Sequence, residues 1–430
     1  MPRMIKSAPG LPPAATGDTR DTVEIMLARL RTGGDDAARD YARRLDGWTG
    51  PIVTPRTAIE AAAARVPSEL KEALAYAHAN ITAFAQAQRA SLHDFETELR
   101  PGLIAGQRSI PVSAAGCYVP GGRYAHIASA LMTIATAKAA GVPHVTAVAP
   151  PRDAHGIDAA TLYAMDLAGA DRILTLGGAQ GIAAMAFGLF GTPAAAILAG
   201  PGNAYVAEAK RQLFGPTGID TLAGPTDLMI LADATADPGL VALDLAGQAE
   251  HGPTSPCWLI TDHEPLARRV RDLMPDTCAR LGGTNADTAR AAWDAMGEII
   301  LCDSREEMAE EADRTAPEHL HLHTTALDWW QGRLTAYGSL FLGAETTVAF
   351  GDKASGPNHV LPTSGAARYT GGLSVHKFLK TVTWQRATDA ALPALARATS
   401  VISRAEGMTG HALSAEARLT AVPPTTALRA

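Results

Sequence analysis

The sequence predicts an α/β fold with two incomplete Rossmann-like parallel-sheet domains, a helical N-terminal segment and a C-terminal helical arm. Short apolar runs alternate with helical patterns from about residue 110 to residue 302, which is typical of βαβ units and a parallel sheet. Glycine-rich turns follow two of these runs, and helical periodicity dominates before residue 90 and after residue 371.

The length of 430 residues exceeds what one hydrophobic core usually supports, so two domains or slightly more are expected. We assign residues 1–117 and 227–370 to a first α/β domain that includes the N-terminal helices. Residues 118–226 form a second, Rossmann-like domain, and residues 371–430 form the C-terminal arm.

The composition is that of a well-packed soluble enzyme, with 47% hydrophobic and 19% charged residues. A net charge of −7 gives no support to binding of nucleic acid or anionic membranes. The four cysteines form no C-x-x-C pair and read as reduced thiols of a cytosolic protein; they are Cys117, Cys257, Cys278 and Cys302. With no secretory leader pattern and no membrane-length apolar run, we expect a cytoplasmic location.

The N-terminal segment has the pattern of scaffold helices. Apolar residues recur at helical spacing from Val23 to Leu30, and Gly33-Gly34 then breaks the run before a second helical segment. A long Ala-rich helical stretch, residues 57–90, is interrupted at Pro67. No residue in this segment suggests chemistry.

Two glycine turns fall where apolar strands of the second domain should end. Gly177-Gly178-Ala179-Gln180 follows one strand and Gly200-Pro201-Gly202-Asn203 follows the next. Ligands of parallel sheets bind at such carboxyl ends, beside helix N-termini. The second turn has Tyr205 at the third glycine position of the dinucleotide fingerprint, and Asp220 lies in a Gly-rich turn. On these residues alone, a dinucleotide site and a plain tight turn remain equal alternatives.

The C-terminal region returns to helical patterns after Gly371. The stretches SVHKFLKTVTWQR and ALARATSVISRAEGMTGHALSAEARL are both expected to be helical, and a Pro/Thr-rich tail follows them.

A Q-x-x-H pair in LAGQAEHGP is the first candidate for chemistry. Residues three apart share one face of a helix, so Gln248 and His251 would project side by side, and Gly252-Pro253 would end the helix after them. For such a pair taken alone, an ordinary polar helix end is the more frequent explanation.

Three further polar stretches are hard to explain as scaffold. APEHLHLHT places Glu318 next to His319, and GDKASGPNHVLPTSG contains Asp352, Asn358 and His359. AEGMTGHALS carries Glu406 and His411 on either side of a glycine-containing kink. Each has an ordinary explanation as a surface pair, a turn cap or a loop hydrogen bond.

Together these stretches offer imidazoles, one carboxylate and one amide carbonyl. Nitrogen and oxygen ligands without thiolate suit Zn²⁺ in an open, catalytic site. A histidine such as His319 is also the natural base at neutral pH, and the neighbouring Glu318 would suit a second proton transfer. Adjacent residues of a strand point to opposite faces, so a loop is needed to bring both to one substrate.

These residues, in this order, resemble the histidinol dehydrogenase family along nearly the whole chain. The matching blocks are GCYVPGGRYAHIASALMTIATAKAAGV, GGAQGIAAMAFG, GPGNAYVAEAKRQLFG, GIDTLAGPTDLMILAD, QAEHGP, APEHL, GDKASGPNHVLPTSG and EGMTGH.

The resemblance implies a homodimer with a shared active site, in which NAD and one zinc ion oxidise a primary alcohol through an aldehyde to a carboxylate. It implies NAD binding by residues 118–226 and a C-terminal arm that reaches the partner subunit. His319 matches the base of the hydride-transfer steps, and Glu318 matches the residue that activates water. The implied zinc ligands are Gln248, His251 and Asp352 from one subunit and His411 from the other. The implied substrate contacts are Thr226, Gln248, His251, His319, Asp352, His359, Glu406 and His411, and the implied NAD contacts are Tyr118, Gln180 and Asn203.

The sequence departs from the biosynthetic members of that family around the substrate. It carries Arg123 and His126 after V-P-G-G, and His376 and Lys377 where the family commonly has S-V-D-D-F. Cationic side chains suit an anionic substrate, because Arg can grip an oxyanion with two hydrogen bonds. Surface or interface positions are the other explanation for these residues.

The pattern looks like the branch that oxidises 2,3-dihydroxypropane-1-sulfonate to sulfolactate, which is our leading expectation. L-Histidinol is the alternative substrate. A non-redox zinc-binding homologue, or a metallohydrolase, is the alternative from another class; retention of Glu318, His319 and the four candidate ligands argues against it.

Overall fold

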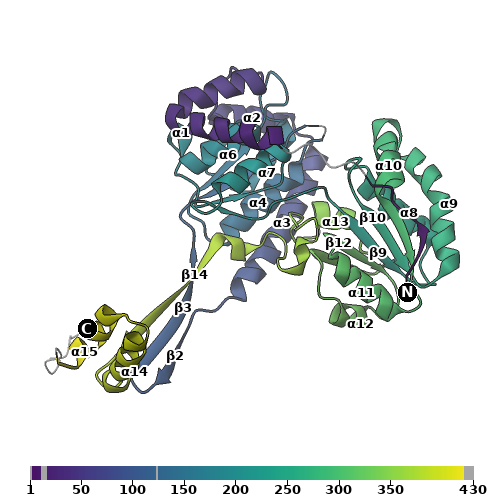
Figure 1. Cartoon of the computed structure of the whole chain (residues 1–430). Coiled ribbons are helices and arrows are strands. Elements are labelled where there is room, and N and C mark those ends of the chain that lie inside the picture. Colours follow the sequence, from purple (N-terminus) through teal and green to yellow (C-terminus); the bar gives the residue numbers. More distant parts are fainter. Residues whose placement is uncertain (1, 11–16, 123, 421–430) are drawn as a thin grey trace. The chain divides into compact units, whose positions relative to one another are not determined.

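The computed structural model describes residues 2–10, 17–122 and 124–420. The chain forms two compact units, one made of residues up to 89 with residues 112–378, and one made of residues 90–111 with residues 379 onward. Figure 1 labels their elements. Within the described residues, no helix is both long enough and apolar enough to cross a membrane.

A six-stranded sheet forms the first layer of the larger unit. Its order is β1-β11-β10-β9-β12-β13, and all neighbours are parallel except β1, which runs antiparallel to β11. The strands are β1 (Arg3–Lys6), β9 (Leu228–Ala232), β10 (Cys257–Thr261), β11 (Gly297–Leu301), β12 (His319–His323) and β13 (Ser339–Leu342). The helices of this domain are α8 (Pro238–Ala249), α9 (Glu264–Arg280), α10 (Gly283–Met296), α11 (Arg305–Thr315), α12 (Leu327–Arg333) and α13 (Val348–Lys353).

A five-stranded, wholly parallel sheet forms the second α/β domain. Its order is β6-β5-β4-β7-β8. The strands are β4 (Ala115–Tyr118), β5 (Val145–Ala149), β6 (Arg172–Thr175), β7 (Ile197–Ala199) and β8 (Gly218–Ile219). Its helices are α4 (Ile127–Ala139), α5 (Ala159–Leu167), α6 (Gly178–Phe187) and α7 (Ala204–Leu213). One wholly parallel sheet and one that is parallel except for β1, with helices interleaved between their strands, confirm the predicted fold class.

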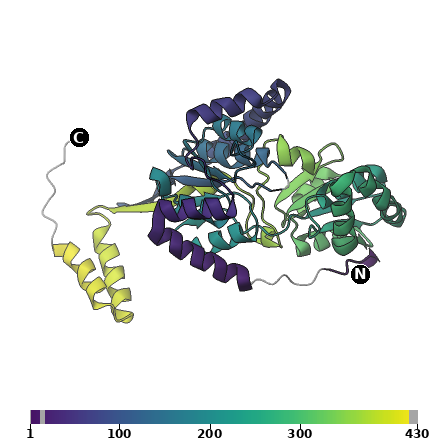
Figure 2. The ribbon, with the colours of Figure 1, turned by 90° about the horizontal axis from the view of Figure 1, so that it is seen from above.

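The N-terminal helices form as predicted but pack elsewhere. Helix α1 (Gly17–Leu45) is kinked at Gly34, and α2 (Arg56–Arg65) and α3 (Ser68–Ala90) are separated near Pro67. Helix α1 packs against α6 and α7, as Figure 2 shows. The expectation that α1 belongs with the first α/β domain is therefore corrected. Its buried residues, between Val23 and Ala42, share a hydrophobic core with Ile182 and Met185 of the second domain.

The predicted boundary between residues 117 and 118 also differs from the structure. It falls inside β4, whose residues Ala115 to Tyr118 pair with β5 along their whole length. A strand cannot be divided between two sheets, so the second domain begins before Ala115.

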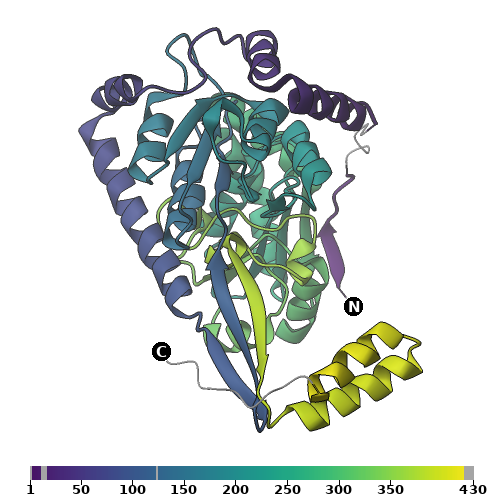
Figure 3. The same ribbon diagram turned by 90° about the vertical axis from the view of Figure 1, so that its left-hand side faces the viewer.

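The smaller unit contains a three-stranded antiparallel sheet and a helical pair, drawn in Figure 3. The strands are β2 (Phe95–Arg100), β3 (Leu103–Pro111) and β14 (Leu379–Ala387), and the helices are α14 (Leu392–Ala405) and α15 (Thr409–Thr420). The helix predicted over SVHKFLKTVTWQR is wrong, because β14 pairs with β3 over nine residues. Thr383 and Trp384 belong to the β-branched and aromatic types that favour strands, and Val375–Phe378 forms only a 3-10 turn.

Candidate active site

The polar site lies at the amino ends of two neighbouring strands of the six-stranded sheet. Strands β9 and β12 are paired in parallel with His319 opposite Leu228, so Asp227 and Glu318 are neighbours just before the strands begin. The side chain of each residue accepts a hydrogen bond from the backbone of the other, because Glu318 N donates to Asp227 Oδ1 at 2.7 Å and Asp227 N donates to Glu318 Oε2. Burial raises the pKa of Asp227 to about 6. Glu318 precedes the strand, so the alternation of strand faces does not separate it from His319.

Glu318 is a buried carboxyl group with two donors on one oxygen. Its Oε2 accepts hydrogen bonds from Thr226 Oγ1 at 2.6 Å and from Asp227 N at 3.0 Å. Burial raises the pKa of Glu318 to about 7, against the opposing effects of His319 and Thr226. A carboxyl group that titrates near neutrality is suited to exchange a proton with water.

His319 is held in one orientation by the backbone. Its Nδ1 lies 2.8 Å from the carbonyl oxygen of Asp227, so Nδ1 carries the proton of a neutral ring. Its Nε2 is buried, has no hydrogen-bond partner among the described residues, and lies 3.7 Å from Asp352 Oδ1. Burial lowers the pKa of His319, but the charges of Glu318 and Asp352 outweigh it and raise the pKa to about 9. The basic Nε2 is thus directed into the site.

The Q-x-x-H pair sits at the end of α8, although not as predicted. Helix α8 ends at Ala249, so His251 lies in the following turn and does not share a helix face with Gln248. His251 Nδ1 lies 3.2 Å from the carbonyl oxygen of Gln248, which leaves Nε2 free, 3.7 Å from Asp352 Oδ2. Gln248 Nε2 donates to Thr226 Oγ1 at 2.7 Å, so its amide oxygen remains available.

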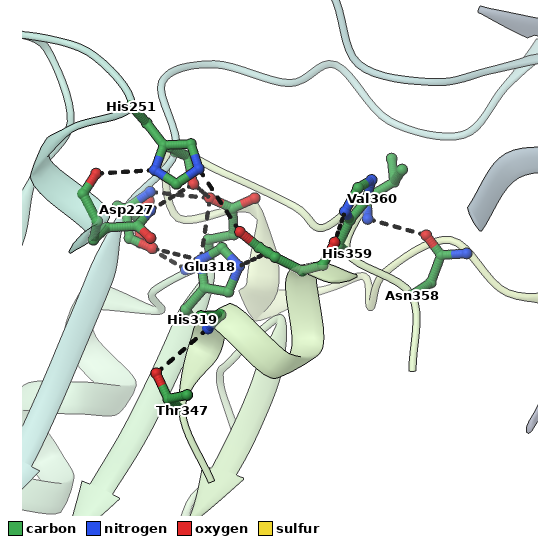
Figure 4. Close-up of polar contacts among 12 residues, drawn as sticks. Asp227, His251, Glu318, His319, Thr347, Asn358, His359 and Val360 are labelled. Atoms are coloured by element: carbon green, nitrogen blue, oxygen red, sulfur yellow. Dashed lines mark hydrogen bonds and ion pairs between the residues drawn. The ribbon is translucent and has the colours of Figure 1, made fainter. Parts of the chain in front are cut away.

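Asp352 stands at the centre of these groups, near the end of α13. Its side chain is 15% exposed, and each of its oxygens is 3.7 Å from a ring nitrogen of His251 or His319. Hydrogen bonding and charge from His319 hold its pKa below the ordinary value despite burial. His359 Nδ1 lies 2.8 Å from the Asp352 carbonyl, and its Nε2 lies 3.0 Å from Ser129 Oγ. Figure 4 shows His251, Glu318 and His319 close together, with His359 to one side of them.

The arrangement fits a zinc ion in its donor types and spacing. Two ligands at about 2.0–2.2 Å from a common zinc ion lie roughly 3.4 Å apart, close to the 3.7 Å between His251 Nε2 and Asp352 Oδ2. The backbone contact at His251 Nδ1 is the usual support of a metal-binding imidazole. Gln248, His251 and Asp352 are thus gathered in one unit. Glu406 and His411 belong to the smaller unit, where both are exposed.

The two glycine turns lie at the carboxyl ends of β6 and β7. Gly200 has φ +116°, and a Cβ there would collide with the carbonyl oxygen of Tyr118, so the turn requires glycine. Asn203 caps α7 by accepting from Tyr205 N and Val206 N, each at 3.1 Å. Helix N-termini at this edge suit the phosphates of a dinucleotide.

The other two predicted NAD residues are largely buried and hold the first turn. Tyr118 OH accepts a hydrogen bond from Gly178 N at 3.0 Å, and burial raises the pKa of Tyr118 to about 12. Gln180 Nε2 donates to Asp46 Oδ2 at 3.0 Å, and the same oxygen accepts from Gly177 N. Contact of Tyr118, Gln180 and Asn203 with NAD stays a prediction.

Sequence reasoning missed Lys210 and Asp46, and it did not assign a partner to Asp220, although all three shape these turns. Asp220 Oδ2 accepts from Gly200 N at 2.7 Å, and Asp220 forms a buried ion pair with Lys210, which also donates to the Gly200 carbonyl. Asp46, the residue after α1, accepts a hydrogen bond from Gly177 N in the other turn. Asp220 therefore holds the backbone turn at Gly200 in place. Its position in the chain after that turn can be read from the sequence, but its contacts with Gly200 and Lys210 cannot.

Several basic side chains influence His126. Burial first, and then charge from His359, Lys353 and His251, lowers the pKa of His126 to about 4. Arg123 lies outside the described residues. His376 is exposed with Nδ1 3.2 Å from Ser374 Oγ, and Lys377 Nζ donates to Thr370 Oγ1 at 3.2 Å.

Comparison with known proteins assigns the family. Residues 12–419 match the family model described as Histidinol dehydrogenase. A Histidinol dehydrogenase homolog of Ruegeria pomeroyi is 67% identical over 98% of this chain and 98% of its own length. The Sulfopropanediol 3-dehydrogenase of the same organism is 56% identical over 94% of this chain and 92% of its own length. The crystal structure of a histidinol dehydrogenase from Elizabethkingia anophelis matches with a TM-score of 0.90 and 31% identity, covering 96% of this chain and 94% of that one. This chain therefore belongs to the histidinol dehydrogenase family and is an NAD-dependent dehydrogenase.

Proposed function

We propose that this protein oxidises a small anionic primary alcohol through its aldehyde to the carboxylate, and that 2,3-dihydroxypropane-1-sulfonate is its substrate. The observation that carries the reaction type is the pairing of two proton-transfer groups at one site. Nδ1 of His319 lies 3.6 Å from Glu318 Oε2, while Nε2 of His319 points away from it toward Asp352. Oxidation to a carboxylate needs one base for the alcohol and one for water.

His319 serves the alcohol. Its Nε2 takes the hydroxyl proton when hydride leaves the same carbon, and the hydrogen bond of Nδ1 to Asp227 O keeps the ring in the required orientation. Glu318 and Asp352 stabilise the imidazolium that forms, since their charges raise the pKa of His319.

Glu318 serves the aldehyde. Its carboxylate takes a proton from water, which adds to the aldehyde carbon. After His319 has released its first proton to solvent, it takes a proton from a hydroxyl of the hydrate while the remaining hydride on that carbon leaves to a second NAD. Because Glu318 is 5% exposed, the water it activates is separated from bulk solvent. Such a site protects a reactive aldehyde between the two oxidations.

We infer that zinc is held by Gln248, His251 and Asp352 with His411 of the partner subunit, in a homodimer with a shared active site. Tyr118, Gln180 and Asn203 are the proposed NAD contacts. When bound, zinc orients and polarises the alcohol oxygen, and NAD accepts hydride. Thr226, His359 and Glu406 are the proposed further substrate contacts, alongside the zinc ligands and His319.

The basic groups support an anionic substrate. Lys353 is exposed next to Asp352, and its charge reaches both His126 and His359. A sulfonate is a permanent anion, so it would gain from Lys353 and from Arg123, whereas cationic histidinol would be repelled. The similarity to the Sulfopropanediol 3-dehydrogenase supports the same choice.

Steady-state NADH formation by the zinc-loaded protein with each alcohol tests the substrate. We expect a higher kcat/KM for the sulfonate than for L-histidinol, and a raised KM for the sulfonate in Lys353→Gln. Lys377→Gln is the matched control, because Lys377 is engaged with Thr370. Turnover of histidinol without turnover of the sulfonate would refute the substrate. Absence of NAD binding in calorimetry would instead favour a non-redox homologue.

A further inference from the structure

A second cluster of metal-ligating side chains lies away from the catalytic residues along the same strand. His319, His321 and His323 alternate along β12, so they share one face, and the last two lie toward its carboxyl end. Asp244 of α8 approaches them there, and one ligand atom from each of Asp244, His321 and His323 lies within 4.8 Å of the others. Both imidazole side chains are 0% exposed.

The hydrogen bonds of His321 define which nitrogen is basic. Its Nε2 lies 3.0 Å from the Gly343 carbonyl oxygen, so Nε2 carries the proton and Nδ1 keeps its lone pair. That Nδ1 has no hydrogen-bond partner among the described residues and lies 3.5 Å from Asp244 Oδ2. Two acceptors face one another inside the protein, which is costly unless a cation lies between them.

His323 approaches the same carboxylate through a nitrogen that is hydrogen-bonded to it. Its Nε2 lies 3.0 Å from Asp244 Oδ2, while its Nδ1 is buried without a hydrogen-bond partner in the described part of the chain. The two imidazole centroids are 4.2 Å apart.

We propose that Asp244, His321 and His323 form a second divalent-metal site, distinct from the catalytic one. The donors are two imidazoles and one carboxylate, which suit Zn²⁺, Co²⁺ or Ni²⁺ and not the oxygen-preferring Mg²⁺ or Ca²⁺. Ligands of a tetrahedral zinc lie roughly 3.4 Å apart, which matches the 3.5 Å between His321 Nδ1 and Asp244 Oδ2. His323 Nε2, which lies 3.0 Å from the same carboxylate oxygen, would separate from it slightly to bind the ion as the third ligand.

A metal ion at this second site would hold together the helices and the strand that carry the catalytic residues. Strand β12 carries His319, α8 carries Gln248 near its end, and α13 carries Asp352 near its end. At the second site, β12 contributes its histidines, α8 contributes Asp244, and Thr347 at the start of α13 donates to Asp244 Oδ1 at 2.9 Å. A bound ion would therefore fix three elements relative to one another, and its role is structural.

Metal counting on the full-length protein tests the proposal. Protein is stripped with chelator, reloaded with Zn²⁺ or Co²⁺, desalted and measured for bound metal per chain by elemental analysis. We expect two ions per chain for the unmodified protein. The His251→Ala/His411→Ala variant lacks two proposed catalytic ligands, so it should keep one, and its Co²⁺ form should retain visible bands of an imidazole-ligated ion.

Adding Asp244→Asn to that double variant should remove the remaining ion, while Asn keeps the side-chain volume and an acceptor for Thr347. Should Asp244→Asn fail to fold, the double variant alone still decides. One ion per chain in the unmodified protein and none in the double variant would overturn the proposal. The result is independent of the proposed function, because no alcohol is oxidised in the assay.

Discussion

Thr226 Oγ1 donates to Glu318 Oε2 at 2.6 Å, and the same hydroxyl oxygen accepts a hydrogen bond from Gln248 Nε2 at 2.7 Å. The Thr226 hydroxyl thus links two groups: the carboxylate of Glu318, which we propose activates water, and the amide of Gln248, which we propose binds zinc. The link makes Thr226 a positioning residue, whose loss should affect both.

Thr226→Val keeps the shape and removes the hydroxyl. Loss of a hydrogen bond to the charged form raises the pKa of Glu318 further, so the acidic limb of the pH–kcat profile should move to higher pH, by about one unit. Thr226→Ser retains the hydroxyl and should leave the limb in place. An unchanged limb in Thr226→Val would show that Thr226 does not tune Glu318.

Glu318→Gln should separate the two oxidations. The carboxylate must be ionised to accept a proton from water, so conversion of aldehyde to carboxylate by the unmodified protein should fall as pH drops through about 7. Glu318→Gln should slow that step roughly 10²- to 10⁴-fold and remove its pH limb. Aldehyde captured by a hydrazine trap measures the first step, which the variant should retain. Equal loss of both steps would contradict the assignment.

The same variant should alter stability in a predictable direction. The folded pKa of Glu318 is raised, so its ionisation costs stability as pH rises from the unfolded value toward about 7. Glu318→Gln should therefore gain Tm relative to the unmodified protein at pH 8, and the gain should vanish below about pH 4.5. A Tm difference independent of pH would contradict the buried ionisation.

His319→Gln should lower kcat for alcohol oxidation roughly 10²- to 10⁴-fold, because the base that takes the hydroxyl proton is lost. His359→Gln is the matched control. Its Nδ1 likewise faces a backbone carbonyl, but its Nε2 is engaged with Ser129, so the variant should raise KM more than it lowers kcat. Full turnover by His319→Gln would show that another group is the base.

Lys210→Met should destabilise the protein by about 3–5 kcal/mol, because it leaves the buried carboxylate of Asp220 without its partner. The side chains of this pair are 3% and 0% exposed. Adding Asp220→Asn should recover most of the loss. Arg268→Met breaks an exposed pair with Glu264 and should cost at most about 1 kcal/mol. Chemical denaturation measures all three.

Local patterns predicted most of the helices and the parallel strands, because burial periodicity is a property of short segments. Local patterns gave a wrong prediction where pairing with a distant strand determines the secondary structure. The run from Leu379 to Ala387 became strand β14 because β3 lies beside it. The predicted helix was also too long, since α8 ends at Ala249 and His251 lies in the turn after it. The candidate zinc residues were found through their resemblance to a family, whereas Asp244 lies 77 residues from His321 and acquires meaning only when the sheet brings α8 to β12.

The ratio of NADH formed to 2,3-dihydroxypropane-1-sulfonate consumed tests the central claim most directly. The unmodified, zinc-loaded protein should form two NADH per alcohol, with sulfolactate as the product and no accumulated aldehyde, because His319 and Glu318 serve successive steps in one site. One NADH per alcohol, with aldehyde released into solution, would contradict the account.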